Sequence, residues 1–150
     1  MEKKYEFFIA GKTRNKENIL KICDLFDKYN ISYYCFLKNE ETMNSYGDPN
    51  KSVEENMKFF ESLSLKSDVI LDIFHQDLDN QKVCKNFLLV LPSGTSGHIE
   101  AGISYGMGKR CFAVGEYSGT DSLYNIFEEI FQNSDELEKF LKEYSLTLNN

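Results

Sequence analysis

The sequence predicts a three-layer α/β/α sandwich around a mostly parallel, five-stranded sheet, and two observations lead to this prediction. Short apolar runs rich in aromatic and β-branched residues recur along the chain, as they do in strands that are buried on both faces. Between most of these runs lie longer stretches whose apolar residues recur at helical spacing. Strands that alternate with helices indicate a parallel sheet covered by helices on both faces.

The first half of the chain predicts one strand–helix–strand unit followed by two more helices. The strands are the runs YEFFIAG and ISYYCFL, and the first should lie at the centre of the sheet. Ser52, with Glu55 three residues later, has the pattern of a capping box at the start of a helix. A polar stretch at 38–51 predicts the longest loop. The predicted elements are strands at 5–11 and 31–37 and helices at 15–29, 52–65 and 67–83.

The second half predicts three further strands and two helices. The run NFLLVLP is the most apolar of the chain and indicates a buried parallel strand. The helix after it has small residues between apolar ones, which is typical of a helix that packs closely on a sheet. Ser134 is expected to cap the last helix. The predicted elements are strands at 86–92, 110–115 and near 129–132 and helices at 97–107 and 134–144.

Length and composition predict one domain, 1–150, with a core of ordinary size. Of the 150 residues, 41% are hydrophobic and 14% are aromatic, which is enough to fold without metals or disulfides. Lys and Arg number 17 against 24 Asp and Glu, and the formal charge of -7 is spread along the chain. Because proteins that bind nucleic acid usually present a basic face, this balance argues against such a partner. It does not exclude a small anionic ligand.

The four cysteines show no spacing typical of a metal site or a redox motif. Each lies in or beside an apolar segment, which predicts small buried residues in a reducing compartment. They are Cys23, Cys35, Cys84 and Cys111. The apolar run near the N-terminus is too short for a secretory signal, and no stretch approaches the ~20 apolar residues that span a membrane. We therefore expect a cytoplasmic protein that does not act on a membrane.

Two loops that follow predicted strands contain the candidate binding residues. Both should lie beyond the carboxyl ends of the strands, where parallel sheets bind ligands. The first contains Gly11, Lys12 and Arg14 and leads into a helix, whose free backbone N–H groups favour an anion. Arg14 can bind a phosphate or carboxylate with two hydrogen bonds. The loop matches neither the dinucleotide motif nor the P-loop, and a tight turn with solvated basic residues is an equal alternative.

The second loop, SGTSG at 93–97, contains more groups that can bind a ligand. Gly94 and Gly97 permit close backbone approach. The hydroxyls of Ser93 and Ser96 can cap the next helix or bind sugar and phosphate oxygens. The loop therefore predicts part of a ligand site, with helix capping as the alternative.

Glu100 and His98 follow this loop directly. The spacing places Glu100 in the first turn of the predicted helix, from which its carboxylate can project toward the same crevice. The alternative is a plain helix start, because acidic residues are favoured in first turns and Ser96 with Glu100 can complete one. His98 can contact a ligand or shuttle a proton, or it can be a surface or capping residue.

Together these residues resemble the nucleoside 2-deoxyribosyltransferase-like family. The resemblance is strongest over NFLLVLPSGTSGHIEAGISYGMGKRCFAVGE. There an apolar strand, a Gly/Ser loop, a glutamate on a helix that ends in Gly-Lys, and a further strand follow in the family's order. The FFIAGKTRN start, the FHQD stretch and the EIFQNSDELEKFL ending fit the same layout, so the likeness covers most of the chain.

The resemblance implies a flavodoxin-like sheet and chemistry at the N-glycosidic bond of a nucleoside or nucleotide. It implies that Glu100 attacks the anomeric carbon and that water or a second base resolves the glycosyl-enzyme. Such a displacement needs an ionised carboxylate beside an oxocarbenium-like centre, and a helix N-terminus would help to keep Glu100 ionised. The loop at 11–15, Ser93 and Ser96 become candidates for phosphate, sugar or base contacts.

One departure from the family concerns an aspartate that usually precedes the apolar strand. This chain has Cys84, Lys85 and Asn86 there. In the family that aspartate commonly positions the substrate or supports acid–base chemistry. Asn86 can hydrogen-bond a base or sugar but cannot act as an acid. Asp77 and Asp72, on the preceding helix, are candidate replacements.

These observations favour an enzyme that hydrolyses or transfers at an N-glycosidic bond, with Glu100 as nucleophile. Two alternatives stay open: a nucleotide-binding sensor or sequestering protein, because binding survives loss of an acid more readily than turnover does, and an NAD hydrolase similar to TIR domains. No cofactor or metal is expected, since His75 and His98 have no partners at metal-ligand spacing. The resemblance also implies a homodimer or larger homo-oligomer.

Overall fold

A computed structural model describes residues 2–38 and 48–148 and contains one sheet of five parallel strands. The strands are β1 (Tyr5–Ala10), β2 (Tyr33–Cys35), β3 (Cys84–Val90), β4 (Arg110–Val114) and β5 (Phe127–Phe131). They lie in the order β2-β1-β3-β4-β5, and each neighbouring pair is parallel. This is the flavodoxin-like order, in which the direction of winding reverses between β1 and β3. The predicted α/β fold is confirmed.

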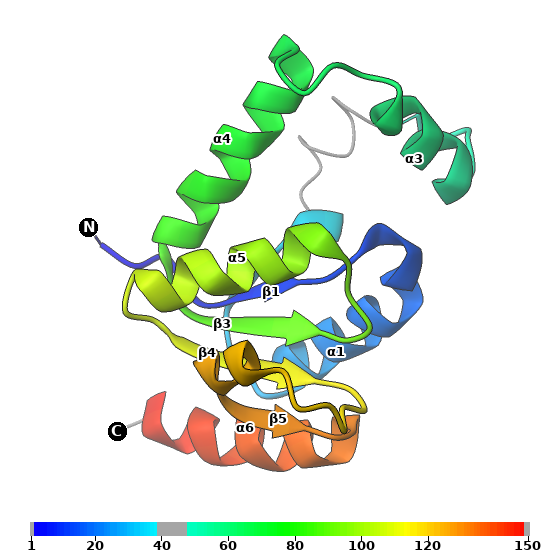
Figure 1. Ribbon diagram of the computed structural model, residues 1–150. Coiled ribbons are helices and arrows are strands. Elements are labelled where there is room, and N and C mark those ends of the chain that lie inside the picture. The colour runs from blue at the N-terminus through cyan, green and yellow to red at the C-terminus, as the bar shows by residue number, and fades with distance from the viewer. Residues whose placement is uncertain (1, 39–47, 149–150) are drawn as a thin grey trace.

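Helices lie on both faces of the sheet (Figure 1). α1 (Lys16–Lys28) and α6 (Ser134–Leu148) pack together on one face, and α4 (Asp68–Lys82) and α5 (Thr95–Gly106) cover the other. Figure 1 shows α3 (Val53–Glu61) and the beginning of α4 projecting beyond the sheet. Within the described ranges, three short 3-10 helices connect these elements: η1 (Thr13–Asn15), η2 (Phe36–Lys38) and η3 (Ser122–Ile126).

Successive residues of each strand point to opposite faces, so the strands contribute to two apolar clusters. In β1, Phe7 and Ile9 pack with the buried residues of α1 and α6. Phe8 and Ala10 pack on the side of α5, where Ala101 is buried. Both faces of the central strands are therefore covered, which explains why their sequences are almost continuously apolar. The four cysteines are buried free thiols, as predicted.

Several predicted boundaries are corrected by the structure. β2 is shorter than the predicted 31–37 because the chain turns into η2 after Cys35. α5 begins at Thr95, two residues before the predicted start. Ser134 is the first residue of α6 and not its cap, because the side chain of Asn133 accepts the N–H of Glu136 at 3.0 Å.

Two further sequence features can be compared with the described residues. The Ser52–Glu55 capping box is present: the Ser52 hydroxyl accepts the Glu55 N–H at 3.1 Å, and the Glu55 carboxylate accepts the Ser52 N–H at 3.4 Å. The predicted loop at 38–51 lies mostly outside the described residues. None of the helices in 2–38 and 48–148 is long and apolar enough to cross a membrane.

Candidate functional site

A cavity of about 260 Å³ lies at the carboxyl ends of β1 and β3, where the strand order reverses. Its volume is close to the lower end of the range for small-molecule sites. Apolar side chains form part of its wall, and two carboxyl groups face the same space. The lining residues are Phe8, Gly11, Lys12, Thr13, Phe36, Met57, Ile73, Asp77, Gly94, Thr95, Ser96, Gly97 and Glu100.

The two carboxyl groups, Asp77 and Glu100, come from the two helices on this face. Ile73 and Asp77 are four residues apart on α4, so both can line the cavity from one face of that helix. Glu100 is held beside them because the side chain of Gln81 donates to its backbone oxygen at 2.6 Å. Gln81 also donates to the Ser104 hydroxyl at 2.7 Å. This buried amide therefore fixes α4 against α5 next to the carboxyl pair.

The structure corrects the predicted environment of Glu100. Gly94 is the N-cap of α5 and Thr95 its first residue, so Glu100 lies in the second turn, whereas the sequence predicted the first. The helix dipole acts mainly within the first turn. Burial raises the pKa of Glu100 to about 8, and the charge of Asp77 contributes to the increase. The prediction that the helix N-terminus keeps Glu100 ionised is therefore wrong.

Asp77 and Glu100 behave electrostatically as a pair. Burial raises the pKa of Asp77 to about 6. With the pKa of Glu100 at about 8, the two groups hold one proton between them from about pH 6 to pH 8. When two groups interact in this way, the proton belongs to the pair and not to either residue. At neutral pH the cavity therefore contains one carboxylate and one carboxylic acid.

The loop before α5 forms one wall of the cavity. Gly97 permits a close approach there: a Cβ atom at this position would lie 2.8 Å from the Leu89 Cδ1 and would collide with the Ser93 hydroxyl, so both side chains would have to move. The close approach presses the start of α5 against β3. The Ser93 oxygen is buried behind this wall, and it has no hydrogen-bond partner among the described residues. Gly94, Ser96 and Gly97 line the cavity, whereas Ser93 does not.

His98 supports this wall from outside the cavity. Its Nδ1 lies 2.8 Å from the Gly94 carbonyl oxygen, and its Nε2 lies 2.7 Å from the Tyr124 hydroxyl. Because a carbonyl can only accept, Nδ1 donates to Gly94, and Nε2 makes the second hydrogen bond with the Tyr124 hydroxyl. His98 thus links the Gly94 loop to η3, and the structure does not place it among the residues that line the cavity.

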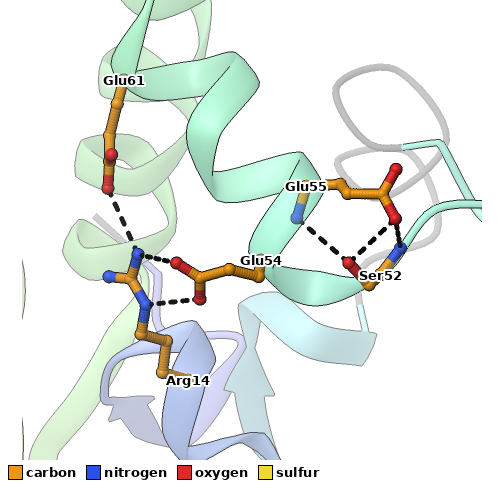
Figure 2. Close-up of polar contacts among 5 residues, drawn as sticks. All are labelled: Arg14, Ser52, Glu54, Glu55 and Glu61. Atoms are coloured by element: carbon orange, nitrogen blue, oxygen red, sulfur yellow. Dashed lines mark hydrogen bonds and ion pairs between the residues drawn. The ribbon is translucent and has the colours of Figure 1, made fainter.

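Some residues of the first loop line the cavity, and Arg14 of the same loop contacts α3. Gly11 and Lys12 line the cavity, as the sequence predicted for a binding loop. Arg14 turns away and donates two hydrogen bonds to Glu54, with Nε–Oε2 at 3.0 Å and Nη2–Oε1 at 2.9 Å (Figure 2). Its Nη2 also lies 3.4 Å from Glu61. The ion pairs of Arg14 depend on a helix about forty residues away, which no local pattern indicates.

Asn86 does not reach the cavity. It lies toward the beginning of β3, and its side-chain nitrogen donates to the Glu6 carbonyl oxygen at 3.0 Å and to the Tyr144 hydroxyl at 2.9 Å. Tyr144 in turn donates to the Glu6 carboxylate at 2.7 Å. The Asn86 amide therefore forms its hydrogen bonds on the α6 side of the sheet. Its proposed contact with a base or sugar is a misassignment, because a strand buried on both faces does not reveal which way each residue points.

A second hollow, of about 730 Å³, is lined by Glu17 and Glu54, but the cations Arg14, Lys16 and Lys21 line it too. A wider and more open groove of about 1170 Å³ follows β2, but Asp27 is the one acidic side chain that lines it. Over residues 2–38 and 48–148, no group of three or more His, Cys, Asp or Glu could hold a metal ion. The arrangement with the clearest chemistry is therefore the cavity with Asp77 and Glu100.

Comparisons with known proteins bear on the fold. A 2-deoxyribosyltransferase from the psychrotolerant bacterium Bacillus psychrosaccharolyticus has a similar structure, with a TM-score of 0.58 and 13% identity over 88% of this chain and 89% of that one. The TIR domain of the Toll-related receptor TRR-2 from Hydra magnipapillata gives a TM-score of 0.55 at 9% identity, over 97% and 98% of the two chains. This likeness shows the fold.

A third solved structure is the CMP N-glycosidase BcmB of Clostridium botulinum. It is 18% identical, with a TM-score of 0.48 over 92% of this chain and 98% of that one. No family model and no curated protein matches the chain. The fold is thus shared with a nucleoside-processing enzyme and with a TIR domain.

Proposed function

We propose that the protein hydrolyses or transfers at the N-glycosidic bond of a nucleoside or nucleotide, with Glu100 as nucleophile and Asp77 as proton donor. The observation that supports this proposal is the pair of carboxyl groups in one small cavity, with a single proton between them near neutral pH. A retaining displacement needs this combination: a carboxylate to attack and an acid to protonate the leaving group.

The first step breaks the glycosidic bond. A carboxylate oxygen of Glu100 bonds to the anomeric carbon, the bond from that carbon to the base nitrogen breaks, and its electron pair goes to the base. Asp77 gives its proton to the base. Positive charge that develops on the sugar stabilises the ionised form of Glu100, so the reaction proceeds through the form of the pair in which Asp77 holds the proton.

The second step releases the enzyme. Asp77, now a carboxylate, takes a proton from water or from an acceptor base. The oxygen or nitrogen that loses this proton attacks the anomeric carbon, and the bond to Glu100 breaks. Both carboxyl groups then return to their original states, so one pair of residues serves hydrolysis and transfer alike.

The remaining lining residues suit a base and a sugar. Phe8, Phe36 and Met57 provide an apolar surface for the flat faces of a base. Lys12 and Ser96 provide polar groups for the sugar. The family resemblance of the sequence supports the same assignment of Glu100.

Chromatographic detection of free base tests the proposal. The purified protein is offered a panel of nucleosides, nucleotides and NAD, beside the variant Glu100→Gln. We expect base release by the wild type and a loss of at least ~1000-fold in the variant, since the amide cannot attack. Glu129→Gln, the same change at an exposed position of β5, is the control and should keep full activity. Retained activity in Glu100→Gln would remove Glu100 from this role.

The same assay distinguishes the proposed reaction from two other functions. The likeness to a TIR domain over 97% of this chain is the reason to include NAD, and release of nicotinamide would identify a TIR-like NAD hydrolase. Tight binding of an intact nucleotide without any product would identify a sensor or sequestering protein. Either outcome replaces the proposed reaction.

We further propose that the protein forms a homo-oligomer, as the family resemblance implies. Exposed apolar side chains on the α3–α5 side support this proposal, because Phe59 and Phe74 are each 51% exposed and Ile99 is 58% exposed. Light scattering during size exclusion measures the molar mass directly. A mass of one 17.4 kDa chain at micromolar concentration would refute the oligomer.

A further inference from the structure

We propose that Glu54 and Glu61 make the site selective for an uncharged nucleoside over its 5′-phosphate, because they bind the arginine that a phosphate would use. This inference rests on the proposed function and names its substrate class. It follows from the contacts of Arg14, the location of α3, and the charges around the cavity.

Two carboxylates bind the Nε and Nη2 atoms of Arg14. Its guanidinium makes a two-pronged pair with Glu54, at 2.9 and 3.0 Å, and a third contact with Glu61 at 3.4 Å (Figure 2). The hydrogen bond from Arg14 lowers the pKa of Glu54, so this carboxylate is ionised at neutral pH. One cation thus faces two anions, and the cluster as a whole is negative.

The cluster lies at the edge of the cavity. Glu54, Met57 and Glu61 are three and four residues apart on α3 and therefore share one face of that helix. Met57 lines the cavity, and so does Thr13, the residue directly before Arg14. The ion pairs join the first loop to α3 at the point where both reach the cavity.

A phosphate that approaches the guanidinium would therefore meet the two carboxylates that bind it. To reach the guanidinium it would have to displace Glu54, and both glutamates would remain beside the phosphate dianion as like charges. Inside the cavity the carboxyl pair adds further negative charge, and Lys12 is the only cation among the described residues that line it. An uncharged nucleoside meets none of this repulsion.

Equilibrium binding tests the inference without any need for turnover. Isothermal titration calorimetry compares adenosine, guanosine, cytidine, uridine and their deoxy forms with the corresponding 5′-monophosphates. We expect the wild type to bind at least one nucleoside with a dissociation constant about tenfold or more below that of the 5′-monophosphate of the same nucleoside. The preference for the nucleoside is the ratio of the two dissociation constants, that of the 5′-monophosphate divided by that of the nucleoside. Glu54→Gln should lower this ratio, and the double variant Glu54→Gln, Glu61→Gln should lower it by about tenfold or more.

Two variants serve as controls. Glu55→Gln changes the same charge on the neighbouring residue of α3, and glutamine can keep the capping box. Glu55 bonds Ser52 and not Arg14 (Figure 2), so the ratio should stay as in the wild type. In the double variant Glu54→Gln, Glu61→Gln, the tighter binding of the 5′-monophosphate should come from the guanidinium that the two glutamates no longer bind. Adding Arg14→Gln to this variant should therefore abolish the increase in affinity for the 5′-monophosphate.

The outcomes separate this inference from the proposed function. Tighter binding of 5′-monophosphates than of nucleosides by the wild type would overturn it, and so would an equal change of the ratio in Glu55→Gln. A protein that shows the expected ratios but releases no base refutes the proposed reaction and leaves the selectivity standing. A folded wild type that binds neither form overturns both.

Discussion

The helices on the two faces of the sheet pack very differently. On one face α1 buries Ile19, Ile22, Cys23 and Phe26, and α6 buries Leu137 and Leu141. On the other face α5 buries the small residues Gly97, Ala101 and Ser104, the buried residue of α4 is the polar Gln81, and α3, all of which is described and which projects beyond the sheet (Figure 1), has no buried side chain. A close-packed face leaves no room for a ligand. The contrast indicates that one face stabilises the fold while the loosely covered face provides the cavity.

The largest effect is expected from a substitution on the loosely covered face. It should lower the rate of base release and leave stability unchanged. Replacing Asp77 with Asn removes the proposed proton donor, and we expect base release to fall about 100- to 10,000-fold. Thermal stability should not fall, because the substitution removes a buried ionisable group. Asp72→Asn, at an exposed position of the same helix, is the control. A rate within tenfold of the wild type would show that Asp77 is not the acid.

The next largest effect should come from the close-packed face and should concern stability. Phe26 is fully buried on α1, so Phe26→Ala should lower the free energy of unfolding by about 3–5 kcal/mol. Phe74 on α4 is 51% exposed, and Phe74→Ala should change the free energy of unfolding by less than about 1 kcal/mol. Urea denaturation measures both. Similar losses in the two variants would abolish the distinction between the faces.

The carboxyl pair should also give the reaction a bell-shaped pH profile. Below about pH 6 both groups are protonated and no nucleophile exists, and above about pH 8 both are ionised and no proton donor exists. We expect kcat/KM to peak near neutral pH and to fall about tenfold per pH unit on each side. Residual activity of Asp77→Asn should lose the alkaline limb. A flat profile from pH 5 to pH 9 would contradict the shared proton.

The same groups should make stability depend on pH. The pKa of Glu100 is raised in the folded state from 4.5 to about 8, so the folded protein keeps a proton that the unfolded chain releases. The free energy of unfolding should therefore decrease as the pH rises from about 4.5 to 8. Glu100→Gln should remove the part of this decrease that Glu100 causes. At high pH the variant should therefore be more stable than the wild type, and each kcal/mol of added stability raises Tm by about 2–4 °C. A constant difference in Tm between wild type and variant would refute the shift.

The smallest effect should be local to α3. Ser52→Ala removes the capping box, which should destabilise the helix by about 1 kcal/mol. Amide hydrogen exchange should accelerate in α3 and remain unchanged in α1. Ser145→Ala is the control, because the Ser145 hydroxyl donates to a carbonyl of its own helix and caps nothing. Faster exchange in both helices would mean that α3 contributes to the core after all.

The fold could be predicted because its signal is local. Apolar runs and helical spacing identify strands and helices segment by segment, and the alternation of these elements implies the parallel sheet. The position of Glu100 was less predictable, because it depends on whether α5 begins at Thr95 or at Gly97. A shift of two residues moved the carboxylate out of the first turn, where the dipole would have favoured its ionised form.

The candidate site was predictable only in part, because contacts between distant segments leave no local pattern. Gly11, Lys12, Gly94, Ser96, Gly97 and Glu100 were predicted and line the cavity. Asp77 could be suspected, since it lies four residues from the apolar Ile73 and so shares its face of α4. The pairing of Arg14 with Glu54 had no such signal, because a charged residue in a loop looks the same whether solvent or a glutamate satisfies it.

The hydrogen bonds around Asn86 have a consequence for the order in which the chain can finish folding. The strands β1 and β3 and the amide of Asn86 are synthesised before one of the groups that this amide contacts, Tyr144, which follows 58 residues after Asn86. Until then the polar groups of Asn86 and Glu6 lack a common partner inside the sheet's α6 face. On the ribosome, this face closes only after α6 has emerged nearly whole.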